Sequence, residues 1–178
     1  METSNGRASK KGRIEAGKKP KPSYAIIDSR SSKTTLASEN VGFDGGKKVK
    51  GRKWHTVVDT LGHILAVFVH AANIHDTKSG IVSVTKACGK YQTIERFCAD
   101  AGYRKSFENN VLNILGLGVD ISLQIKQEFE VLPKRWVVER TFAWLNNSRR
   151  LSKDYERKTL HQENMIYISH LQTLLRRY

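Results

Sequence analysis

Short apolar runs and helical periodicities alternate along this chain of 178 residues. The run YAIID at 24–28 is short and ends in an acid, which is typical of a buried strand whose last residue reaches the rim of a sheet. Two further runs, WHTVVDT at 54–60 and ILAVFVHA at 64–71, are rich in β-branched and apolar residues. The Leu61-Gly62 pair between them predicts a tight turn that joins antiparallel strands.

Helical and strand patterns then follow each other to the end of the chain. The spacing predicts a helix over about 77–87, a strand in TIERFCAD at 93–100, a helix over 106–115 and an alternating strand in VDISLQI at 119–125. The last segment, 158–178, has apolar residues at near-helical spacing and should be a packing helix. This order predicts an α/β fold in which a mixed sheet is flanked by helices.

The first 22 residues differ in composition from the rest of the chain. They contain seven Lys or Arg and almost no large apolar side chains, so they cannot bury enough surface to fold alone. We therefore expect residues 1–22 to be a basic flexible arm or linker and residues 23–157 to form one domain. The helix at 158–178 should belong to that same domain.

The charge of the chain narrows the class of partner. Lys and Arg total 31 against 17 acids, a net charge of +14, which favours a polyanion such as nucleic acid. A membrane surface would attract the same charge, so charge alone cannot separate an enzyme from a binding module. The two cysteines are too few for a disulfide framework or a zinc site. With no spanning apolar run and no signal sequence, we expect a cytoplasmic, nucleoid-associated protein without a membrane partner.

A lone acid in RWVVERTFAWL, residues 135–145, raises the question of chemistry. On a helix, Glu139 lies on a polar stripe that borders the core face, where an ordinary salt bridge to Arg135 or Arg140 is the simplest interpretation. Two other acids, Asp28 and Asp100, end predicted strands, so three carboxylates could meet at one edge of the sheet. Hard oxygen ligands of this kind suit two Mg²⁺ or Mn²⁺ ions, which can activate and stabilise the oxygens of a phosphodiester.

Four blocks in this order carry a resemblance to a known family: AIIDSRSSKT, GFDGGKKVKGRKWHTVVDTLGHILAVFVHAANIHD, FCADAGY and LPKRWVVERTFAWLNNSRRLSKDYE. Over residues 19–155 the chain resembles the catalytic core of DDE-type insertion-sequence transposases, particularly insertion-sequence family five. The resemblance implies a ribonuclease-H-like fold and a metal-dependent transposase that cuts the ends of a DNA element and joins them to a target. It also implies that Asp28, Asp100 and Glu139 are the catalytic residues and bind two Mg²⁺ or Mn²⁺ ions.

The chain departs from the pattern of this family at two points. Relatives have an arginine four positions before the glutamate, which Arg135 matches, and a basic residue seven or eight positions after it, where this chain has Asn146 and Asn147. Arg149 or Arg150 could take that place. Relatives also carry a domain ahead of the core, so a partner from a separate reading frame could supply recognition of the DNA ends, and a homodimer could hold two ends.

Eight cations are expected to contact the DNA backbone without reading bases: Lys47, Lys48, Lys50, Arg52, Lys53, Arg135, Arg149 and Arg150. Asp59, His70, His75 and Asp76 are better explained as turn and strand-end residues than as metal ligands. Of Trp136 and Trp144, one should be buried and one half-exposed, and Trp136 could stack on an unpaired base. Two alternative functions stay open: a catalytically inactive or regulatory DNA-binding remnant of a transposase, and a basic structural nucleic-acid binder without metal.

Overall fold

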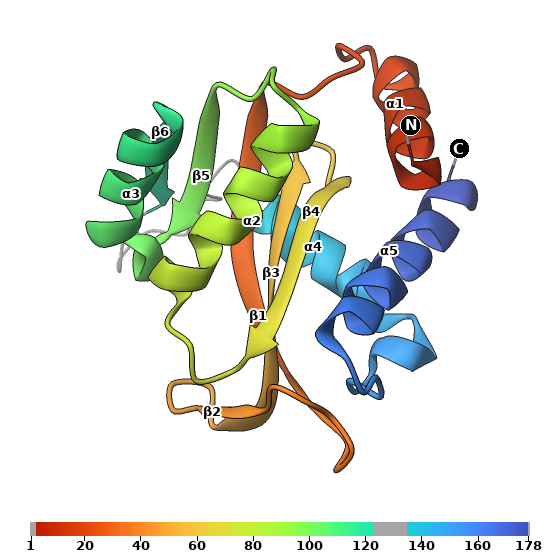
Figure 1. Ribbon diagram of the computed structural model, residues 1–178. Helices are drawn as coiled ribbons and strands as arrows, with labels where there is room; N and C mark the ends of the chain where they lie inside the picture. The colour runs from red at the N-terminus through yellow and green to blue at the C-terminus, as the bar shows by residue number, and fades with distance from the viewer. Residues whose placement is uncertain (1–2, 123–134, 178) are drawn as a thin grey trace, which may run out of the picture.

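The computed structural model describes residues 3–122 and 135–177 and places one six-stranded sheet between helices (Figure 1). The strands are β1 (Tyr24–Lys33), β2 (Gly42–Asp44), β3 (Val49–Asp59), β4 (Ile64–Ala71), β5 (Arg96–Asp100) and β6 (Gly118–Ser122). The helices are α1 (Ser4–Glu15), α2 (Asp76–Lys90), α3 (Ser106–Leu115), α4 (Arg135–Asn146) and α5 (Thr159–Leu175), with short 3₁₀ turns η1 (Ala101–Tyr103) and η2 (Arg149–Leu151). The predicted α/β class is confirmed. Part of the strand predicted at 119–125 lies outside the described residues.

The sheet is mixed, and β1 lies near its centre. Along one edge β1 runs antiparallel to β3, from the pair Ala25 and Asp59 to the pair Lys33 and Gly51. Along its other edge β1 runs parallel to β5, but only through residues 24–26. β6 continues the parallel part beside β5, whereas β4 and β2 both pair with β3.

Alternate residues of β1 supply two hydrophobic clusters, one on each face of the sheet. Ile27 packs in the cluster that includes Phe107 of α3 and Val84 of α2. Ile26 packs in the other cluster with Val138 of α4, on the opposite face. In Figure 1, α2 accordingly crosses in front of the sheet and α4 runs behind it. Among the described residues, none of the helices is both long enough and apolar enough to cross a membrane.

The turn between β3 and β4 has the form predicted from Leu61-Gly62. Gly62 has a φ of +85°, and a Cβ added there would lie 2.7 Å from Thr141 Oγ1, so both backbone and packing require glycine. Asp59 Oδ1 accepts hydrogen bonds from the amides of Leu61 and His63 at 2.8 and 2.9 Å. Asp59 is thus a turn acid, in agreement with the sequence interpretation.

The prediction of a flexible arm is wrong for most of residues 1–22, because residues 4–15 form helix α1. Arg13 Nη1 lies 2.6 Å from the fully buried carboxylate of Asp59. At the other end of the helix, Asn5 meets Nδ1 of His170 at 2.8 Å and donates its amide to the carbonyl of Tyr167. Figure 1 shows α1 alongside the C-terminal part of α5. The segment has few apolar residues, and it is ordered by buried polar contacts that composition does not reveal.

Replacing Arg13 with Met should destabilise the fold by about 3 kcal/mol, because it leaves the buried Asp59 carboxylate without its partner. Burial alone would raise the pKa of Asp59, but the hydrogen bonds and charges of His63 and Arg13 hold that pKa below its usual range. Urea unfolding measures the change. Lys11→Met, which breaks an exposed pair with Glu15, is the matched control and should cost less than about 1 kcal/mol. Equal costs for the two variants would contradict the role of Arg13.

Stability should fall as the pH drops below about 6.5, because burial and the nearby His63 charge lower the pKa of His170 to about 3. The neutral ring accepts a hydrogen bond at Nε2 from the amide of Ile64. The folded chain therefore binds fewer protons at His170 than the unfolded chain does between these two pKa values, so protonation favours unfolding. Burial also lowers the pKa of His55 to about 3, so protonation of His55 favours unfolding in the same way.

Urea unfolding between pH 7.5 and pH 4 tests this dependence, with a slope of up to about 1.4 kcal/mol per pH unit for each histidine. His170→Gln retains an acceptor but does not titrate, so its stability should decline less steeply over the same range. A variant whose slope equals that of the wild type would show that His170 does not contribute.

Candidate active site

The parallel ladder of β1 and β5, continued past its last pair, would bring Asp28 level with Asp100. The ladder pairs Tyr24 with Arg96 and Ile26 with Cys98, and the same register continued by two residues places the two acids opposite each other. Neighbouring strands are roughly 4.8 Å apart, and residues two positions apart along a strand share a face. Both acids therefore lie on the face of Ile26 and Cys98, which is the face covered by α4.

Asp28 lies two residues beyond the last parallel pair, and it does not end its strand, because the pairing of β1 with β3 continues to Lys33. Its Oδ1 accepts a hydrogen bond from the amide of Ser29 at 2.7 Å. Asp100 is the last residue of β5, as predicted, and its Oδ1 accepts from the amide of Gly102 at 3.0 Å, which caps η1. Both acids are partly exposed, so a ligand can reach them.

Tyr103 ties the turn after Asp100 to the middle of the sheet. Its side chain is fully buried, and its hydroxyl lies 2.7 Å from Nδ1 of His55 on β3. Burial raises the pKa of Tyr103 well above its usual value, and the charges of Asp76, Asp28 and Asp100 raise it further. The buried turn fixes the direction of the Asp100 carboxylate.

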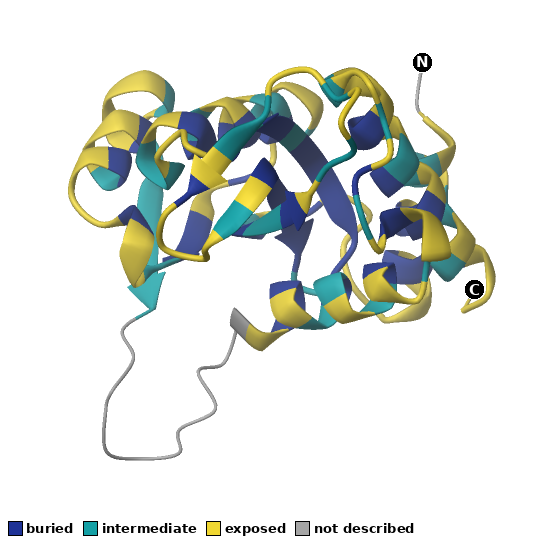
Figure 2. Cartoon of the chain, turned by 90° about the horizontal axis from the view of Figure 1, so that it is seen from below, coloured by how far each residue is buried: buried dark blue, intermediate teal, exposed yellow. Residues whose placement is uncertain are grey.

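Helix α4 lies across the same face and carries Glu139. One side of the helix meets the β3–β4 turn, where Thr141 donates to the carbonyl of Gly62 at 2.9 Å. On another side Asn146 accepts a hydrogen bond from Arg30 of β1, two residues beyond Asp28. Glu139 precedes Asn146 by seven residues, or two helical turns, and so lies on that same side. Figure 2 shows this helix, which follows the grey trace, with buried residues towards the sheet and exposed residues outwards.

The donor set fits a hard divalent cation only in part. Asp28 and Asp100 are paired carboxylates on one face, and Mg²⁺ takes one or two such ligands directly while retaining water. In the part of the chain that the structure describes, however, no group of three or more His, Cys, Asp or Glu side chains lies close enough to hold a metal ion. The register of β1 with β5, continued by two residues, would set the two aspartates side by side, and Glu139, which is exposed, lies on the facing helix.

Two of the predicted DNA contacts are corrected, because Arg52 and Lys53 are buried. Arg52 is 0% exposed; its Nη1 pairs with Asp154 at 3.1 Å, and its guanidinium also donates to the carbonyl of Glu39. Lys53 is 6% exposed and its Nζ bridges Asp44 at 3.3 Å and Asp76 at 2.8 Å. A buried cation that already has a carboxylate partner cannot turn to a phosphate without leaving that partner unpaired.

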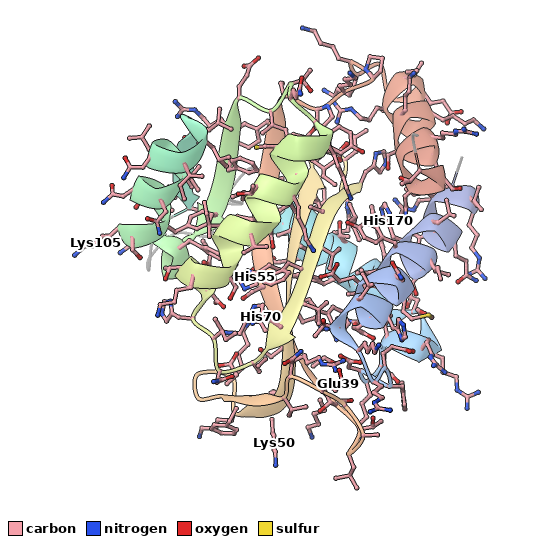
Figure 3. All side chains as sticks on the ribbon, in the orientation of Figure 1. Glu39, Lys50, His55, His70, Lys105 and His170 are labelled. Carbon is pink, nitrogen blue, oxygen red and sulfur yellow. The ribbon has the colours of Figure 1, made fainter. Side chains whose placement is uncertain are left out.

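Each of the remaining predicted cations is either exposed or has a side chain that the structure does not describe. Lys47, Lys48 and Lys50 are exposed between β2 and β3, although Lys47 Nζ donates to the carbonyl of Ser29 at 2.8 Å. Figure 3 shows Lys50 pointing away from the body of the protein. In η2, Arg149 is exposed, as is Arg150, which pairs with Glu156 at 2.7 Å. Arg135 begins α4, but its side chain is outside the described residues.

Sequence reasoning missed a polar network on the face opposite the acids. Ser29, next to Asp28, donates to Asp76 at 3.0 Å, and Asp76 also holds Lys53. His55 stacks on His70, with ring centroids 5.0 Å apart, and both rings lie in the interior of the sheet in Figure 3. The signal in the sequence is that Lys53 and His55 alternate with the core residue Val57, so that the three share one face of β3.

The residues that the sequence analysis explained as turn and strand-end residues, and not as metal ligands, have structural roles. His75 caps α2, where its Nδ1 accepts the amide of Thr77 at 3.3 Å. His70 is buried on β4, and Asp76 belongs to the network just described. The half-exposed Trp predicted in α4 is Trp136, at 43%, whereas Trp144 is partly buried and not a core residue.

Comparison with known proteins adds an independent line of evidence. The model of the family described as "Transposase DDE domain" matches residues 19–174. A protein from Burkholderia cepacia named "Putative transposase for insertion sequence element IS402" is 33% identical over 116 residues, which are 61% of this chain and 55% of that protein. The chain therefore spans about half the length of this relative. The matches do not separate insertion-sequence groups, so membership of insertion-sequence family five stays a prediction.

Among solved structures, the catalytic core domain of BIV integrase superposes with a TM-score of 0.50 over 84% of this chain and 82% of that one, at 12% identity. That likeness concerns the fold alone and confirms the predicted ribonuclease-H-like class. The family model covers most of the chain, including Asp28, Asp100 and Glu139. The chain thus belongs to the family of transposase DDE domains.

Proposed function

We propose that this domain catalyses metal-dependent cleavage and strand transfer of DNA in the transposition of an insertion sequence. The observation that carries the proposal is the register of β1 and β5, which, continued beyond the paired residues 24–26, would set Asp28 beside Asp100 on the face that α4 covers. Glu139 lies on that helix, on the side that meets β1 through Asn146 and Arg30. Membership of the family of transposase DDE domains supports the same function.

The roles of the three acids follow from their places. Asp28 and Asp100, each oriented by a backbone amide, would hold the divalent ions, and Glu139 would complete the site from the helix. Bound Mg²⁺ or Mn²⁺ ions supply activation of the attacking oxygen and neutralisation of charge on the phosphate. Because each ion takes only one or two carboxylates, a two-ion site does not require all three acids around a single point.

DNA is the proposed substrate and partner. The net charge of +14 favours a polyanion, and exposed cations that remain available to phosphates include Lys48, Lys50 and Arg149. Contacts of this kind position the backbone but carry no sequence information. Recognition of element ends by a partner from a separate reading frame, a homodimer around two ends and association with the nucleoid extend this proposal to the whole protein.

Asp100→Asn and Glu139→Gln should each reduce nicking and strand transfer in Mg²⁺ or Mn²⁺ by about 10²- to 10³-fold, since each removes a negatively charged oxygen ligand. The assay uses supercoiled and short linear DNA at fixed salt. Asp120→Asn is the matched control, because Asp120 is an acid on the neighbouring strand β6 that pairs with Arg96 and is not proposed as a ligand.

The control variant should retain wild-type activity in both metals. An inactive wild type that still binds DNA would instead favour the inactive or regulatory remnant. That alternative draws on the observation that the described residues contain no group of three donors close enough for one ion.

Replacing Lys48 and Lys50 together with Ala should weaken binding to duplexes of any sequence and reduce the slope of log K against log salt by about 2. Fluorescence anisotropy over a range of salt concentrations measures the slope. Lys11→Ala on α1, which removes an exposed cation far from the β2–β3 segment, is the control and should leave the slope unchanged. Slopes that are the same in the double variant and the wild type would exclude these two lysines as phosphate contacts.

A further inference from the structure

Four side chains form a stack along the outer side of α4. The guanidinium of Arg140 lies 4.4 Å from the ring centroid of Trp136 and 4.6 Å from that of Trp144. The guanidinium of Arg177, near the C-terminus, lies 3.7 Å from the Trp144 ring. The order is therefore Arg177, Trp144, Arg140, Trp136, with cations and indole rings alternating. Spacings of four residues along α4 place three of these side chains in one row.

The body of the protein holds this row in place. Arg140 donates from Nη2 to the carbonyl of Leu61 at 3.0 Å, so the cation between the two indoles is anchored to the β3–β4 turn. At the same turn, a Cβ on Gly62 would lie 3.1 Å from the Trp144 ring, which shows how closely the ring packs on the backbone. The row is therefore organised before any ligand binds, which reduces the entropy lost on binding.

The two indoles differ in what remains exposed. The guanidinium groups of Arg140 and Arg177 both lie over the ring of Trp144. Because like charges repel, the two groups are expected to occupy opposite faces of that ring. Trp136 has Arg140 on one face, and its side chain is still 43% exposed. Among the side chains that the structure describes, which do not include that of Arg135, no second ring or cation lies against Trp136. The row ends in an indole with surface open to solvent.

This open indole is close to the proposed catalytic acid. Trp136 precedes Glu139 by three residues, which is about one helical turn. A flat group stacked on Trp136 would thus lie beside the strip of surface that carries Glu139. The neighbouring exposed positions on that strip, Ala143 and Asn146, are small or polar. An extended apolar partner surface would need larger apolar neighbours there.

We propose that Trp136 is a stacking platform for an unpaired DNA base adjacent to the phosphodiester held at the acid site. A base continues the alternating row as its next layer, and the Arg140 cation behind the indole adds positive charge that favours the accompanying phosphates. The proposal rests on the proposed function, because it assigns the position of a base relative to Glu139. It predicts a preference for DNA ends with an unpaired base over fully paired ends.

The test is a binding cycle in EDTA, so that its result does not depend on catalysis. Affinities are measured by anisotropy for two duplexes that differ only at one unpaired terminal position, which carries either a base or an abasic residue. Wild-type protein should prefer the base by roughly 5- to 100-fold, the range expected for one base stacked on an aromatic ring. Trp136→Ala should bind the two duplexes equally, and Trp136→Phe should retain much of the preference.

Phe43→Ala, which removes another exposed aromatic side chain on β2, is the matched control and should keep the full preference. A Trp136→Ala variant with the wild-type preference would overturn the proposal, as would a wild type that does not distinguish the duplexes; the row would then be internal packing or a protein contact. A general folding defect lowers both affinities and leaves their ratio intact. The nicking assay can fail while this preference holds, so the two proposals are tested separately.

Discussion

The position of β1 between an antiparallel and a parallel neighbour is the constraint on which the rest of the structure depends. Ala25, Ile26 and Ile27 are each no more than 1% exposed, because both faces of this part of the strand are covered by helices. From Asp28 onwards the strand becomes polar while it still pairs with β3. The first acid therefore lies at the boundary between a two-sided core and a polar edge. The parallel register, continued past residues 24–26, would set the second acid beside it.

The two faces of the sheet at this boundary have different tasks. The α4 face carries Asp28, Asp100 and Glu139, whose partial exposure leaves them accessible. The α2 face, one residue further along β1, holds the network of Ser29, Asp76 and Lys53, in which the carboxylates already have a cation. Because neighbouring residues of a strand point to opposite faces, a buried and satisfied network can brace the backbone that presents an open acid.

The cations of the chain also fall into two groups, those paired with carboxylates inside the protein and those exposed on its surface. Arg13 and Arg52 pair with fully buried carboxylates and Lys53 pairs with the partly buried Asp76, and these pairs hold α1, the segment around Asp154 and the start of α2 against the sheet. Removing one partner from such a pair leaves the other charge unpaired in a medium of low polarity. The cations that can serve DNA are the exposed ones, so the net charge of the chain overstates the charge of any binding surface.

The sequence by itself determined the order of strands and helices apart from α1 and β2, and the turn at Gly62, because these depend on local periodicity and backbone conformation. It proposed the three acids from recognisable blocks of residues. The tertiary structure decided which acids share a face, since the register of β1 with β5 is a pairing between segments 72 residues apart. It also decided that residues 4–15 are a helix and that Arg52 and Lys53 are internal. Long-range ion pairs order these groups, and a pattern of apolar and polar positions does not encode which distant carboxylate a cation will meet.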